Sequence, residues 1–154
     1  MTTTRQFKAQ VDPVEDGEAG EFEALVSVFD NTDSYGDVVR PGAFAKSLAG
    51  WAESGDSIPV VWAHRWDDPF SHVGWVKSAE ETARGLVVRG VIDDTDNPTA
   101  KQVRALLRGR RIKQFSFAYD VLDSGPAKVD GKDVTELREL SILEVGPCLS
   151  LIHI

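Results

Sequence analysis

Apolar and polar positions alternate with a period of two over most of this chain, a pattern typical of half-buried β-strands. Turn-forming residues separate the alternating segments. The pattern predicts seven strands, at 5–11, 22–30, 58–64, 70–79, 84–93, 112–122 and 134–145. The third of these is apolar throughout (IPVVWAH), as in a strand buried on both faces. Segments 70–79 and 84–93 are predicted to form a hairpin, and the loop SGPAKVDGKD is predicted to join the last two strands.

Two segments follow a helical period instead. Segment 43–52 places Phe44, Leu48 and Trp51 on one face. Segment 93–111 has start signals in Asn97 and Pro98, a stop signal in Gly109, and an apolar stripe between them (Val103, Leu106, Leu107). Together the elements predict an α+β fold that is mainly β: a small closed or nearly closed β-barrel of about seven strands with peripheral helices.

Composition narrows the function. At 154 residues the chain is expected to be one domain, and its net charge of −8 disfavours nucleic acid as a partner. The single cysteine excludes an intrachain disulfide. No apolar stretch approaches the roughly 20 residues that span a bilayer, and the N-terminus lacks an apolar signal core. We therefore expect a protein that is cytosolic where it is made, without a membrane partner.

Three side chains could together form an activated nucleophile. His64 ends one predicted strand, Ser116 lies within the aromatic strand QFSFAY, and Glu144 lies in the apolar strand LSILEVG. A serine hydroxyl is a poor nucleophile at neutral pH unless a base lies within hydrogen-bond reach and a third group orients that base. Histidine, with an unperturbed pKa of about 6.5, suits the role of the base.

The residues alone leave alternatives to each of these roles. Alternation places Phe115, Phe117 and Tyr119 on one strand face, so Ser116 points the other way and is expected to face solvent. His72 competes with His64 as the base. Glu139 competes with Glu144 as the orienting carboxylate.

Other site chemistry is not supported by the spacing of the residues. His64, His72 and Asp67 lack a compact metal-ligand spacing, and the acidic run 93–97 lacks the calcium-loop pattern. There is no phosphate-binding glycine loop. We therefore expect neither a metal nor a cofactor.

Several ordered blocks of the sequence resemble one known family. They are VFDNTDSYGDVVRPGAFAKSL (28–48), IPVVWAHRWDDPFSHVGWV (58–76), RGLVVRGVI (84–92), RALLRGRRIKQFSFAY (104–119) and LRELSILEVGP (137–147). In this order and spacing they are similar to the prohead maturation proteases of tailed bacteriophages, whose fold resembles that of the herpesvirus assemblin proteases. The resemblance covers roughly Phe22 to Pro147.

The resemblance implies roles for the three residues. His64 corresponds to the general base, Ser116 to the nucleophile, and Glu144, in the family's "L-x-E-V" position, to the third member. It implies a serine endopeptidase that cleaves scaffold protein, the N-terminal region of the capsid protein, and itself. The place of action would be the assembling prohead in the host cytoplasm, and a second copy of the chain is a further candidate partner.

Two other interpretations remain open. In the first, the chain is a catalytically inactive relative that acts as a structural or scaffold-binding component of the capsid; Gln114 and Phe115, bulkier than the residues the family has beside the serine, favour it. In the second, it is an unrelated small-barrel binding module.

The last six residues, LSLIHI (149–154), stand where the family continues into a "P-A-N"-like segment. They are the translation of the end sequence that a transposase introduces into sequencing libraries. We therefore expect a single protease-type domain over 1–148, truncated at its C-terminal end, and a non-native tail over 149–154. Whatever the origin of the tail, we expect no function for His153 or for the nearby Cys148.

Overall fold

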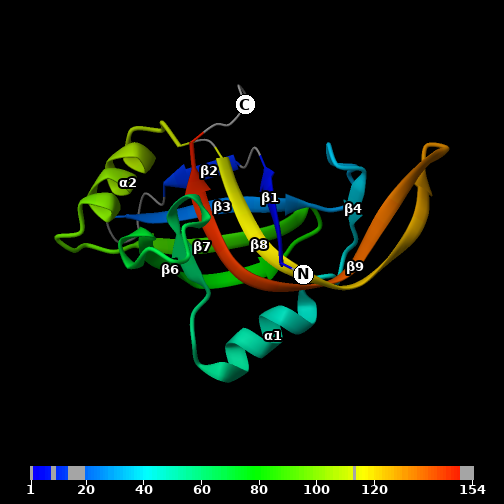
Figure 1. Ribbon diagram of the computed structural model, residues 1–154, viewed down its shortest axis with the longest axis horizontal. Helices are drawn as coiled ribbons and strands as arrows, with labels where there is room; N and C mark the ends of the chain where they lie inside the picture. The colour runs from blue at the N-terminus through cyan, green and yellow to red at the C-terminus, as the bar shows by residue number, and fades with distance from the viewer. Residues whose placement is uncertain (1, 8–9, 14–19, 113, 150–154) are drawn as a thin grey trace.

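The computed structural model describes residues 2–7, 10–13, 20–112 and 114–149. These residues form one strongly curved sheet with helices on its periphery (Figure 1). The strands are β1 (Thr2–Phe7), β2 (Gln10–Pro13), β3 (Glu21–Val28), β4 (Asp37–Val39), β5 (Pro59–Val61), β6 (His72–Glu81), β7 (Gly85–Ile92), β8 (Gln114–Val129) and β9 (Lys132–Cys148). The helices are α1 (Ala45–Ser54) and α2 (Pro98–Arg108), with short 3-10 turns η1 (Trp62–His64) and η2 (Pro69–Ser71).

The sheet runs in the order β1-β8-β9-β5-β6-β7-β3-β2, and β4 pairs with the far end of β9. This path curls into a half-barrel, which confirms the predicted α+β class. The described residues form nine strands rather than about seven. Segment 5–11 contributes to two strands with different partners, since β1 pairs with β8 and β2 pairs with β3. The turn-rich segment 31–42 contains the short strand β4, which is parallel to β9.

The hairpin β8–β9 is much longer than predicted. The strands stay paired to Val129 and Lys132, so only Asp130 and Gly131 form the turn. Both turn residues have positive φ, 52° and 77°, which is the requirement of a tight two-residue turn and explains the Asp-Gly sequence. The predicted loop 124–133 is therefore mostly strand. The outer halves of β8 and β9 project from the body as a long arm, and β4 pairs with β9 in this arm over Thr135–Leu137 (Figure 1).

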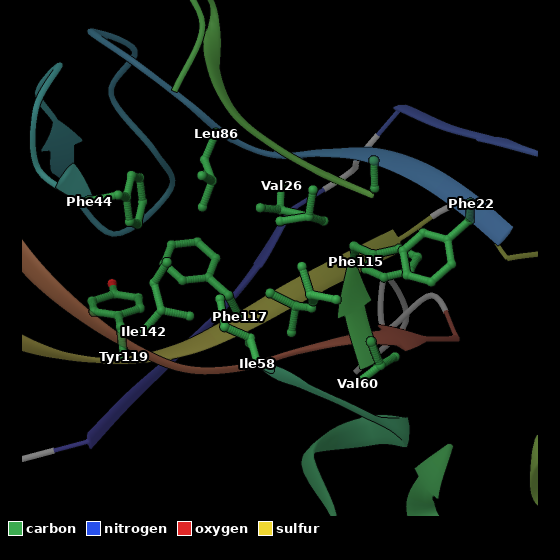
Figure 2. Packing of buried hydrophobic residues seen from close by; sticks show 14 of the residues in the cluster. Phe22, Val26, Phe44, Ile58, Val60, Leu86, Phe115, Phe117, Tyr119 and Ile142 are labelled. Atoms are coloured by element: carbon green, nitrogen blue, oxygen red, sulfur yellow. The ribbon is translucent and has the colours of Figure 1, made fainter. Parts of the chain in front are cut away.

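The core fills the concave side of the sheet. Phe115, Phe117 and Tyr119 of β8 point into it, as their alternation predicts (Figure 2). The ring of Phe117 lies 4.7 Å from Tyr119 and 5.6 Å from Phe44, measured between ring centroids. Aromatic rings at these separations contribute beyond their buried area. The aromatic face of β8 is thus anchored in the core.

The helices begin and end close to the predicted positions. The Asn97 side chain accepts a hydrogen bond from the Thr99 backbone N–H, Pro98 opens α2, and Gly109 follows its last turn. In α2 the buried residues are Ala100, Val103 and Leu107, while Leu106 is partly buried. Phe44 is fully buried where α1 begins, and Leu48 and Trp51 of α1 pack against the core. Both predicted helices are confirmed.

The predicted tail at 149–154 lies outside the described residues except for Leu149, which is 53% exposed. Its origin stays a prediction, as does the extent of the domain. No helix among the described residues has the length and apolar character that crossing a membrane requires.

Candidate active site

The candidate site is built on the second face of the β8–β9 pair, opposite the aromatic core face. Ser116 of β8 pairs with Gly146 of β9, and Ala118 pairs with Glu144. Side chains alternate across a strand, so Ser116 and Glu144 project to the same side. One step further along β9 the register shifts, and Leu143 has no partner on β8.

Because of this register shift, neighbouring side chains of β9 reach both the core and the candidate site. In a regular strand Ile142 would project to the same face as Glu144. With one extra residue between them, Ile142 joins the core at 1% exposure while Glu144 faces the candidate site. Helix α1 satisfies the backbone here: Ser47 Oγ accepts from the Ile142 N–H at 2.9 Å, and Trp51 Nε1 donates to the Ile142 carbonyl at 3.0 Å.

Strand β5 brings the histidine to this face. Val60 pairs in parallel with Val145 of β9. A Cβ atom on Gly146 would lie 1.9 Å from the Val61 carbonyl oxygen, so a glycine at this position lets the two backbones approach closely. After Val61 the chain turns sharply, and η1 packs against β9 near its end (Figure 1).

The turn itself corrects the sequence analysis, which places His64 at the end of a strand. Strand β5 ends at Val61, and Ala63 and His64 both have left-handed backbone conformations, with φ of 51° and 57°. A left-handed conformation costs a non-glycine residue roughly 1 kcal/mol or more, and two in succession persist only where the surrounding structure enforces them. With this backbone conformation the imidazole points back toward Ser116 of β8 and Glu144 of β9.

The three predicted side chains meet in one hydrogen-bonded row. His64 Nδ1 contacts Glu144 Oε1, and His64 Nε2 contacts Ser116 Oγ. Ser116 is 0% exposed and Glu144 is 2% exposed, whereas the His64 side chain retains 12% exposure. No donor in the described part of the chain reaches Glu144 Oε2, so His64 is the only hydrogen-bond partner of this buried carboxylate there. The contacts expected of the trio are present.

The alternatives from the sequence are placed elsewhere. Ser116 is buried rather than facing solvent, and the His64 ring lies against its hydroxyl. His72 is exposed, and its Nε2 lies 3.1 Å from the Trp66 carbonyl oxygen. Glu139 forms an ion pair with Lys46 at 2.9 Å. Neither His72 nor Glu139 takes part in the row.

Cys148, which the sequence analysis sets aside, lies next to the row. It pairs with Gln114, two residues before Ser116 on the same strand, and its side chain is buried. Burial raises the pKa of the Cys148 thiol; a hydrogen bond with Ser116 opposes this effect and the charge of Glu144 adds to it. A thiol with a raised pKa is protonated at neutral pH, so Cys148 is a poor nucleophile despite its position.

The row has the arrangement of an activated serine. The imidazole can accept the hydroxyl proton at Nε2 while its Nδ1–H donates to the carboxylate, which sets the tautomer and the orientation of the ring. Among the described residues no group of three or more His, Cys, Asp or Glu side chains is placed to hold a metal ion.

Comparison with known proteins identifies the family and supports the fold. Residues 7–149 match the sequence profile of the caudovirus prohead serine proteases. The prohead protease of Enterobacteria phage HK97 is 34% identical over 131 residues, which cover 82% of this chain and 56% of that protein. This chain therefore spans little more than half the length of that relative. The bacteriophage T4 capsid assembly protease, gp21, superposes with a TM-score of 0.69 at 11% identity, over 97% of this chain and 98% of that one, and supports the fold.

Proposed function

Because this chain belongs to the caudovirus prohead serine protease family, we propose that it is a serine endopeptidase of prohead maturation. The observation that carries the proposal is the single row Ser116–His64–Glu144, assembled from three distant segments. A buried serine, a strained histidine turn and a buried glutamate meet here at some cost in stability. Such costs are typical of functional sites.

The proposed mechanism is acyl transfer. Ser116 Oγ attacks the carbonyl carbon of the peptide bond as His64 Nε2 takes the hydroxyl proton. The imidazolium then gives this proton to the leaving amine, and water repeats the sequence to release the acyl group. Glu144 holds Nδ1–H and stabilises the positive charge on the ring. Its burial strengthens this interaction, because little water screens the pair.

The proposed substrates are the scaffold and the N-terminal region of the major capsid protein of the same phage, with self-cleavage as a further reaction. Membership of the prohead protease family and the part that the T4 neighbour has in capsid assembly support this choice. The reaction would take place inside the assembling prohead, in the host cytoplasm.

Co-expression with the scaffold and capsid protein of the same phage tests the proposal. The wild-type chain should cut both proteins, as shown by gel shifts and by mass spectrometry of the new termini. Ser116→Ala and His64→Ala should each lower the rate by about 10⁴- to 10⁶-fold. Cutting that persists in Ser116→Ala would reject this nucleophile.

Labelling with a fluorophosphonate separates the enzyme from an inactive relative. The wild type should be labelled at Ser116 and the Ser116→Ala variant should not. A chain that binds scaffold but neither labels nor cuts is a structural component of the capsid, and the protease proposal then fails.

A further inference from the structure

Two large aromatic side chains project from the loop that follows the proposed base. Trp66 is 46% exposed and Phe70 is 65% exposed. Both lie between β5 and β6, within six residues of His64. Exposed tryptophan and phenylalanine lose hydrophobic stabilisation, so a pair of them beside a reactive group points to a binding surface.

The loop that carries them is held firmly. The Asp68 carboxylate accepts from the Phe70 N–H at 3.0 Å and from the Ser71 hydroxyl at 2.9 Å. The hydrogen bond from the Ser71 hydroxyl is the main cause that holds the pKa of Asp68 below its usual range, and the bond from the Phe70 N–H adds to it. On the other side Asn97, which caps α2, donates from Nδ2 to the Phe70 carbonyl at 2.8 Å. The aromatic side chains are therefore presented on a preorganised loop, which lowers the entropic cost of binding.

Trp66 adjoins the candidate active site directly. Its ring meets the His64 imidazole edge to face, with centroids 6.3 Å apart and planes at 68°. The backbone N–H of Trp66 also donates to the His64 carbonyl at 3.0 Å. In the proposed reaction His64 passes a proton between Ser116 and the leaving amine, so a bound peptide lies along the imidazole. Its side chains nearest the cut bond then come within reach of Trp66.

We propose that Trp66 and Phe70 form a specificity surface that binds an apolar side chain of the substrate, aliphatic or aromatic, within two positions of the cleaved bond. The inference rests on the proposed protease function and adds the substrate chemistry. The occupant is a peptide segment, because Trp66 adjoins His64, which would act on the cleaved bond. An apolar side chain is favoured because it removes aromatic surface from water without leaving a buried polar group unpaired.

A peptide panel tests this surface. Peptides based on the mapped cleavage site carry Leu, Phe, Ala or Asp at each of the two positions on either side of the bond. The wild type should prefer Leu or Phe at one of these positions. Trp66→Ala should lower kcat/KM for the preferred peptide about tenfold, the usual effect of removing an aromatic anchor, and should remove most of the preference. Phe70→Ala should weaken the preference, and Trp66→Phe should restore part of it.

Tyr35→Ala is the matched control. Tyr35 is 61% exposed, but it lies before β4, which pairs with the opposite end of β9 from Glu144. Its loss should leave kcat/KM and the preference unchanged. Fluorophosphonate labelling, which needs the row but no peptide contact, should be unaffected by Trp66→Ala.

Three results would overturn the inference. If the preference survives both Trp66→Ala and Phe70→Ala, these two side chains do not bind the substrate. Loss of labelling in Trp66→Ala assigns Trp66 to positioning His64 instead of binding peptide. If Tyr35→Ala lowers kcat/KM and the preference as much as Trp66→Ala does, the loss is not specific to Trp66 and Phe70.

A binding measurement that needs no mapped cleavage site separates failure of this inference from failure of the proposed function. Labelled peptides that tile the N-terminal region of the capsid protein are titrated with Ser116→Ala, with and without Trp66→Ala, and binding is followed by fluorescence anisotropy. Trp66-dependent binding of apolar peptides to a chain whose wild type never cuts would reject the protease and keep the surface.

Discussion

The two halves of the β8–β9 hairpin share one hydrogen-bonded ladder but differ in how deeply β8 is buried and in what packs against it. In the inner half, from Phe115 to Tyr119, every residue is buried. In the outer half the β8 residues from Val121 to Val129 are exposed or partly buried, and Leu122 is 60% exposed, while β9 there still buries Val134, Leu137 and Leu140. The inner half of β8 has the aromatic core on one face and His64 on the other, whereas no residue of the outer half of β8 is buried.

The comparison shows that a charged residue on a paired strand can take part in a reaction site only where other segments bury it. Charged residues occur in both halves of the hairpin. In the arm Asp123 and Arg138 form an ion pair at 3.0 Å, and both side chains are about half exposed. Such a pair contributes little to stability, because water and salt screen it. Glu144, on the same strand as Arg138, is buried with His64 as its partner, and there the charge can act on chemistry.

The largest expected difference between the halves is in catalysis. Glu144→Gln keeps the shape of the side chain but removes its charge and the acceptor that sets the His64 tautomer. We expect kcat/KM on a cleaved peptide to fall by about 10⁴-fold, as for the equivalent change in other triads. Glu139→Gln, further out on the same strand, should change kcat/KM less than twofold. A Glu144→Gln variant as active as wild type would remove Glu144 from the mechanism.

The next difference is in stability. Phe117→Ala in the inner half opens a cavity among packed rings and should lower the free energy of unfolding by about 3–5 kcal/mol. Leu122→Ala in the arm removes a side chain that is already in water and should change it by no more than about 0.5 kcal/mol. Urea unfolding followed by circular dichroism measures both. Similar losses in the two variants would mean that the arm is packed in solution.

A smaller difference is expected from two left-handed residues. Ala63 beside the candidate site and Asp130 in the arm turn have φ of 51° and 52°. Aspartate tolerates this conformation through local hydrogen bonds, but alanine does not. Ala63→Gly should therefore raise the free energy of unfolding by about 1 kcal/mol, and Asp130→Gly by a few tenths. Because glycine holds the turn less tightly, kcat/KM should fall in the first variant while it stays constant in the second.

The smallest expected effect is the pH response of the arm. Hydrogen bonding from Arg138 holds the pKa of Asp123 below its usual value near 3.8. A carboxylate with a lowered folded pKa stabilises the fold above its unfolded pKa, and this contribution is lost as the pH falls through the folded pKa. Amide exchange in the arm should therefore accelerate as the pH falls below about 4, after correction for the intrinsic rate.

Asp123→Asn is the control for this response. The variant should lack the extra acceleration in the arm, while exchange in the inner half should match that of the wild type. An identical pH profile in the two proteins would show that the ion pair has no role in holding the arm.

Features that depend on residues close together in the chain could be predicted from the sequence. The period of two places Phe115, Phe117 and Tyr119 in the core, and Asn97 and Gly109 bound α2, because these features depend on residues a few positions apart. The family blocks also single out His64, Ser116 and Glu144 as candidates. The trio could be listed from the sequence, but its geometry could not.

The packing on the second face of β8 could not be predicted from the sequence, because it depends on a segment far away in the chain. Alternation predicts an exposed Ser116, yet it is buried, because the turn at His64 comes from 52 residues away and closes over it. Neither the left-handed pair Ala63–His64 nor the bulge at Leu143 has a signature in local propensity. The first depends on packing of η1 against β9, and α1 binds the backbone of Ile142 beside the second. A periodic pattern records which face of a strand is apolar. Whether the other face meets water or another segment depends on long-range packing.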